Sequence, residues 1–133
     1  MLGPTYRFTI QNTTGQTLAA NAVTVKPRRW KYGTDGSLAD EASGVADVLA
    51  QTATLANAAF KAGNTQDNLT NKYIGGFFEF TATAPVSSLG NVDLYLERSV
   101  DGGTTWPDNG IGTGWVATLN FTAAGTKRDV IEV

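Results

Sequence analysis

The sequence predicts a single all-β domain, either an antiparallel β-sandwich or a jelly-roll-like fold, with at most one short helix. Several segments alternate apolar and polar residues, which is the pattern of a strand with one buried face. The 15 glycines divide the chain into short segments, and charged residues make up only 17% of it, below the usual level of about a quarter. A chain of 133 residues suits one domain, which we place at 1–133.

The first half of the chain contains two expected strands. Residues 5–12 alternate in character, and a turn at 12–15 follows them. The side chains expected to point inward are Tyr6, Phe8 and Ile10. A second extended segment spans 22–32, where Pro27 lacks an N–H and therefore indicates a sheet edge or a bend.

The segment from 45 to 60 can be interpreted in two ways. It contains neither glycine nor proline, and Val45, Val48 and Leu49 fit the spacing of a helix face. The alternation at 52–55 fits a strand instead. The local pattern by itself favours the helix.

The second half of the chain is predicted to be rich in strands that follow a polar loop. These strands lie at 73–83, 91–100, 115–121 and 130–133. Within them, Trp115 is expected to point inward and Glu97 to point outward. The pair Gly75-Gly76 indicates a bulge or a close approach of the backbone to a neighbour.

The chain has no cysteine and no histidine. Disulfide scaffolds, thiol nucleophiles and zinc fingers are therefore excluded, as are imidazole metal sites and Ser-His-Asp catalysis. No carboxylate pair lies in a recognisable catalytic or calcium-binding frame. We therefore predict a protein that is not an enzyme and that uses no cofactor and no metal.

Charge and hydropathy also limit the partners that we expect. No apolar run reaches the roughly 18 residues that a membrane span needs, and the first residues lack the pattern of a signal peptide. A net charge of −2 gives no general attraction to nucleic acid. Neither a membrane nor a nucleic acid is an expected partner.

The sharpest local motif is the segment 99–106, which reads Ser-Val-Asp-Gly-Gly-Thr-Thr-Trp. It resembles the Asp-box hairpin, Ser-x-Asp-x-Gly-x-Thr-Trp, at the positions Ser99, Asp101, Gly103, Thr105 and Trp106. The aspartate can accept hydrogen bonds from its own turn, the glycines can adopt positive φ, and the tryptophan can fold back under the turn. Sialidase-like propellers carry several such boxes away from the catalytic centre. A single copy therefore implies a structural hairpin and not a glycosidase.

A second candidate site is the segment 26–32, Lys-Pro-Arg-Arg-Trp-Lys-Tyr, which combines basic and aromatic residues. Such a segment can bind phosphates and stack on bases, or it can form a solvated strand edge or a protein contact. Acidic residues between 35 and 47 can neutralise it, which favours the protein contact. The candidate interface residues are Arg28, Arg29, Trp30 and Tyr32, because arginine and aromatic side chains often anchor interfaces.

The tryptophans also allow a platform on which sugars could stack. The hairpin explains Trp106, and strand alternation explains Trp115. Trp30 is therefore the residue that carries the carbohydrate-binding alternative.

The combined pattern of the chain resembles small virion proteins of tailed bacteriophages. The resemblance covers most of the chain and is carried by 6–15, 22–32, 65–73 and 91–108. It implies a β-sandwich or jelly-roll fold without catalytic residues, as in capsid decoration (cement) proteins and tail components. It also favours a strand over a helix at 52–60.

The resemblance leads us to expect a non-enzymatic capsid decoration protein that stabilises the shell by bridging subunits of the major capsid protein. Such a protein is assembled in the host cytoplasm and acts in the virion, as a homo-oligomer, with residues 1–5 as a docking arm. The alternatives are a tail component, or a carbohydrate-binding module of a tail or receptor-binding apparatus.

Overall fold

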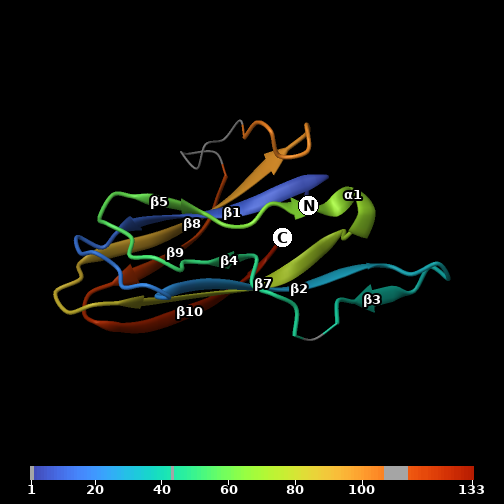
Figure 1. The fold of residues 1–133 in the computed structure, drawn as a ribbon. Coiled ribbons are helices and arrows are strands. Elements are labelled where there is room, and N and C mark those ends of the chain that lie inside the picture. Colours follow the sequence, from blue (N-terminus) through green and yellow to red (C-terminus); the bar gives the residue numbers. More distant parts are fainter. Residues whose placement is uncertain (1, 43, 107–113) are drawn as a thin grey trace.

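The computed structural model describes residues 2–42, 44–106 and 114–133. Two antiparallel sheets of five strands each pack face to face, with the core between them (Figure 1). Within the described ranges the only helix is α1 (Asn68–Asn71), a single turn capped by the side chain of Asp67. None of the helical structure in these ranges is long and apolar enough to cross a membrane. The expected all-β sandwich is confirmed.

The first layer, called here the β1 sheet, has the strand order β5-β1-β8-β9, with β6 paired to the start of β1. Its strands are β1 (Thr5–Thr13), β5 (Phe60–Ala62), β6 (Gln66–Asp67), β8 (Gly90–Ser99) and β9 (Trp115–Phe121). The centre is the long pairing of β1 with β8, which runs in register from Thr5↔Ser99 to Thr13↔Asn91.

The second layer, called here the β2 sheet, has the order β10-β7-β2-β3, with β4 paired to β2. Its strands are β2 (Val23–Tyr32), β3 (Leu38–Asp40), β4 (Leu49–Ala50), β7 (Gly75–Ala84) and β10 (Gly125–Glu132). The chain changes sheet after β1, β4, β6, β7 and β9. Many neighbours within a sheet are therefore distant in sequence.

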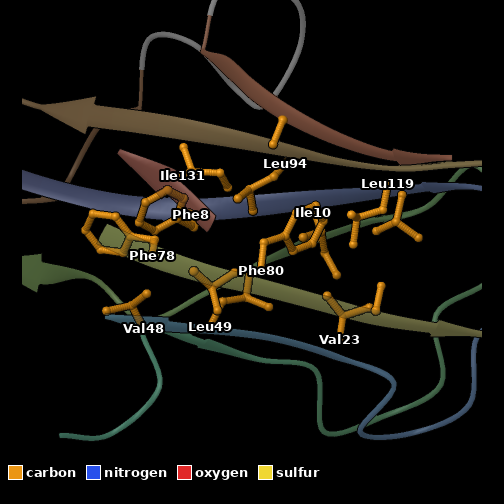
Figure 2. Packing of buried hydrophobic residues seen from close by; sticks show 14 of the residues in the cluster. Phe8, Ile10, Val23, Val48, Leu49, Phe78, Phe80, Leu94, Leu119 and Ile131 are labelled. Atoms are coloured by element: carbon orange, nitrogen blue, oxygen red, sulfur yellow. The ribbon is translucent and has the colours of Figure 1, made fainter. Parts of the chain in front are cut away.

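The core is built from the inward residues of both sheets, as the alternation predicts (Figure 2). Phe8 of β1 and Phe78 of β7 meet across the two layers, with their ring centroids 4.7 Å apart. Both side chains are completely buried. Burial of such aromatic side chains is the main term that holds the two sheets together.

The segment 45–60 contains no helix in its described residues, so the helix that its local pattern favours is wrong. Leu49 pairs with Val25 in the β2 sheet, and Leu55 forms an isolated bridge with Leu18. The strand favoured at 52–60 is also wrong over most of its length, because only Phe60 lies in one. Backbone pairing with distant segments overrides the weak helix propensity of these residues.

The side chain of Trp115 points outward, contrary to expectation, and is 57% exposed. The register of β8 and β9 shifts between Leu94 and Tyr95, since Leu94 pairs with Ala117 while Tyr95 pairs with Trp115. One extra residue, Val116, is therefore accommodated on β9, and the bulge turns Trp115 to the outer face. Further along β9, Leu119 is buried as expected.

The described N-terminal residues lie against the sandwich. Leu2 belongs to the core, and the carbonyl of Pro4 accepts a hydrogen bond from the backbone N–H of Asn68. Thr5 already belongs to β1. Residues 2–5 of the expected docking arm are thus packed against the domain.

Strand β10 is an edge of the β2 sheet and is exposed along most of its length. Lys127 and Asp129 share the strand face of the buried Ile131, so they point to the core side of the sheet. The ammonium group of Lys127 lies 5.7 Å from the ring centroid of Phe121. Phe121 is the last residue of β9, an edge strand of the β1 sheet. Charged side chains therefore flank the open side of the sandwich here.

Candidate functional site

Strand β2 divides the predicted interface residues between its two faces. Arg28 and Tyr32 are exposed on the outer face of the β2 sheet, and Trp30 lies between them on the same face. Arg29 points the other way and is 6% exposed. The structure thus brings three of the four predicted residues together and places the fourth inside the sandwich.

The outer face of the β2 sheet carries a cluster of exposed apolar side chains around the half-buried Trp30. We call it the Trp30 patch, and it consists of Trp30, Tyr32, Leu38, Phe77 and Val130. The rings of Trp30 and Phe77 meet edge to face, with centroids 5.1 Å apart. Large apolar side chains that stay exposed and adjacent are typical of a surface that contacts another molecule.

Gly75 allows the Trp30 ring to lie close to the backbone of β7. It is the register partner of Trp30 on β7, and a Cβ atom there would lie 2.9 Å from the indole Cζ2 and 2.7 Å from the carbonyl oxygen of Val133. Only glycine leaves this space open. The close backbone approach predicted at Gly75-Gly76 is therefore present and orients the aromatic ring.

Charged groups surround the Trp30 patch. Arg28 donates a hydrogen bond to Asp40 at 2.8 Å, and both side chains are largely exposed. A surface hollow of about 400 Å³ lies beside Phe77; its lining residues are Lys26, Pro27, Arg28, Phe77, Glu79 and Val130. An apolar centre with a charged rim is the usual composition of a protein-binding surface.

Arg29 holds together a polar cluster between the sheets. Its guanidinium forms a two-pronged ion pair with Glu41, and it donates to Tyr6 Oη at 2.8 Å and to Gln66 Oε1 at 3.1 Å. The Tyr73 ring lies 4.5 Å from the guanidinium carbon. Burial by itself would lower the pKa of Arg29, but the hydrogen bonds to Glu41 and Tyr6 outweigh it and raise the pKa. Arg29 is therefore a structural residue.

The hairpin at 99–106 has the hydrogen bonds that its motif predicts. Ser99 Oγ donates to Asp101 Oδ1 at 2.6 Å, and the backbone N–H of Gly103 donates to Ser99 Oγ at 2.9 Å. Thr105 donates to Asp101 from its hydroxyl at 2.6 Å and from its backbone N–H at 2.9 Å. Gly102 and Gly103 adopt positive φ angles of 74° and 92°. The carboxylate of Asp101 is thus fully occupied by its own turn.

Trp106 covers a partly buried ion pair on the outer face of the β1 sheet. Arg7 Nε donates to Glu97 Oε2 at 2.7 Å, and the Arg7 guanidinium lies 4.1 Å from the centroid of the Trp106 ring. Glu97 points outward as expected, and it is nevertheless only 1% exposed. The hairpin folds back over this part of the sheet, which gives Trp106 a structural role.

The hairpin makes folding stability depend on pH. Hydrogen bonds from Ser99 and Thr105 lower the pKa of Asp101 below its usual value of 3.8. A carboxyl group whose pKa is lower in the folded state than in the unfolded state stabilises the fold. This stabilisation is complete at pH values above the unfolded-state pKa, and it is lost as the pH falls through the folded-state pKa. We expect Asp101→Asn to lower Tm at neutral pH and to lower it much less in strong acid. Thermal melts of the wild type and of Asp101→Asn, followed by circular dichroism from neutral pH to strong acid, test this expectation. A Tm difference that does not change with pH would contradict the role given to the Asp101 carboxylate.

Phe77, Val130 and Leu38 were not among the predicted interface residues. Strand alternation could have indicated Phe77, since it has the opposite parity to Phe78 and Phe80 on the same strand. The positions of Val130 and Leu38 depend on the pairing of β10 and β3 with distant strands. No local sequence pattern contains that information.

In the described part of the chain, no group of three or more acidic side chains is arranged to hold a metal ion. No protein-family model matches the chain, and no curated protein or solved structure matches it either. The Trp30 patch and the hairpin therefore have to be interpreted from their own geometry.

Proposed function

We propose that the protein is a non-enzymatic structural component of a tailed-bacteriophage virion, and that it decorates the capsid by docking on the major capsid protein. The sequence resemblance supports the virion setting. The observation that carries the docking role is the Trp30 patch, where exposed aromatic and apolar side chains adjoin Arg28.

The Trp30 patch has the physical properties of an interaction anchor. The Trp30 ring is already held against Gly75 and Phe77, so little side-chain entropy would be lost when a partner covers it. Among the described residues Arg28 is paired only with the exposed Asp40, and its guanidinium can form a two-pronged contact with a carboxylate of a partner. Tryptophan, tyrosine and arginine are the residues that most often dominate binding energy.

A decoration protein does not need a tight individual contact. A shell offers many equivalent positions, so modest contacts accumulate when a closed homo-oligomer engages several capsid subunits at once. The sandwich carries its own core and depends on no disulfide, because the chain contains no cysteine. These properties suit a protein that must persist outside the cell.

Glutamate substitutions in the Trp30 patch and at its charged rim test the docking role. We expect Arg28→Glu and Val130→Glu each to reduce the copies per purified particle at least about tenfold, because either change places a carboxylate in the apolar contact. Quantitative mass spectrometry of purified particles measures the occupancy. Both residues are exposed, so Tm should stay close to that of the wild type.

Lys61→Glu is the matched control. Lys61 is also exposed and undergoes the same charge change, but it lies on β5 of the opposite sheet. If Arg28→Glu and Val130→Glu were present on particles at the wild-type copy number, or if Lys61→Glu lost as many copies as they do, the Trp30 patch would not be the docking surface. Copy number also separates the two virion locations, since capsid decoration requires on the order of hundreds of copies and a tail component far fewer.

A further inference from the structure

The outer face of the β1 sheet carries a second, different surface. It combines exposed or half-buried aromatic rings with polar side chains, of which one is charged, and we call it the Trp115 face. Its members are Phe60, Gln11, Tyr95, Asp93, Trp115 and Thr118. We infer that this face binds a neutral oligosaccharide chain that lies across the strands. This inference goes beyond the proposed docking function and uses the opposite side of the sandwich.

Strand register brings the aromatic residues of the Trp115 face together. Tyr95 of β8 is the direct cross-strand partner of Trp115 on β9. Phe60 of β5 lies on the other side of β1, with its ring centroid 6.5 Å from that of Tyr95. The three rings thus follow one another across the sheet, where the strand spacing of about 4.8 Å is close to the length of one sugar ring.

The orientation of Trp115 is fixed although its ring is exposed. Its indole N–H donates to Thr118 Oγ1 at 2.9 Å, and the Thr118 hydroxyl donates in turn to Asp93 Oδ1. The polar atom of the indole is therefore satisfied from within the sheet, while 57% of the residue faces solvent. A ring held open in this way can stack on the C–H face of a sugar without first losing much rotational freedom.

The polar groups of the Trp115 face complement hydroxyl groups. The Gln11 side chain accepts a hydrogen bond from Tyr95 Oη at 3.4 Å, while its amide N–H groups have no partner among the described residues. Two residues further along β8 and β9 from the pair Asp93 and Thr118, the Asn120 side chain donates to the Asn91 side chain at 2.7 Å. Amides and carboxylates placed beside aromatic rings supply the directional bonds that fix a ligand in such a site.

The charge distribution favours a neutral glycan over a protein partner on this face. Among the members of the Trp115 face, Asp93 is the only charged residue, and it already accepts from Thr118. The nearby Arg7–Glu97 pair is covered by Trp106. The Trp30 patch on the other sheet has a rim of exposed cations and anions instead. The two faces therefore suit different classes of partner.

Nuclear magnetic resonance titration of the full chain tests the inference. The probes are cellohexaose, xylohexaose and chitohexaose, each raised to about 10 mM, so that affinities down to about 1 mM are detected. The three tryptophan indole N–H signals report separately on Trp30, Trp106 and Trp115. We expect the Trp115 signal to shift with at least one probe while the Trp30 signal stays in place.

Matched variants locate the binding. Trp115→Ala should weaken binding about tenfold or more, whereas Trp30→Ala on the opposite sheet should leave it unchanged. Thr118→Val keeps the side-chain volume but removes the bond that orients the indole, and it should weaken binding several-fold. A shift centred on Trp30, equal loss in both alanine variants, or no shift with any probe would overturn the inference. The absence of any shift would leave the docking role untouched, because Arg28→Glu tests that role on the opposite sheet. A shift centred on Trp30 would instead favour carbohydrate binding at the Trp30 patch.

Discussion

Replacement of Arg29 by alanine is expected to lower the free energy of unfolding by about 3–5 kcal/mol. The change leaves the Glu41 carboxylate buried without its cation, and Tyr6 Oη and Gln66 Oε1 lose their donor. The cost of such a change comes mainly from the charge that remains, not from the value of the pair itself. Urea denaturation followed by circular dichroism measures the loss.

The neighbouring residue provides the control. Arg28→Ala removes an ion pair whose partners are both exposed, and it should cost less than about 1 kcal/mol. If the two alanine variants were equally stable, Arg29 would not hold the cluster described between the sheets. Arg29→Lys should recover part of the stability, because it keeps the charge but loses the two-pronged geometry.

Phe78→Ala is expected to cost about 3–5 kcal/mol, because it opens a cavity at the point where the two sheets meet. Phe78 is completely buried, and its ring contacts Phe8 of the opposite layer. The matched change Phe77→Ala should cost much less, since Phe77 is 44% exposed on the outer face. Thermal melts of the two variants compare the loss of stability at these two adjacent positions.

A small effect of Phe78→Ala would show that the sheets are held by other contacts. A large effect of Phe77→Ala would show that the Trp30 patch is part of the structural core and not a free surface. The particle-occupancy experiment would still apply in that case, because Arg28 and Val130 are both exposed and neither variant changes Phe77.

The strands that were predicted well are those whose pattern is local. In β1 the inward positions Tyr6, Phe8 and Ile10 are all completely buried, because alternation depends only on the period of an extended backbone. The Asp101 turn was predictable for the same reason, since its donors lie within a few residues of the carboxylate.

The failures depend on contacts that are distant in sequence. Trp115 has the parity of an inward residue, but the register shift between β8 and β9 turns it outward. The segment at 45–60 is not helical because parts of it, at Leu49, Ala50 and Leu55, pair with residues between 18 and 25, which its own composition does not reveal. The Trp30 patch was found only in part, because cross-strand pairing brings Phe77 and Leu38 beside β2.

The charges on β10 have a consequence for any assembly that concentrates many copies of the protein. An exposed edge strand is a template on which a second chain can add its own strand. Lys127 and Asp129 lie on the core-side face of this edge strand, where a strand added by a second chain would place its apolar side chains. The two charges therefore disfavour such an addition. Crowded copies should therefore meet through their flat surfaces, and extension into a continuous fibre along this edge is disfavoured.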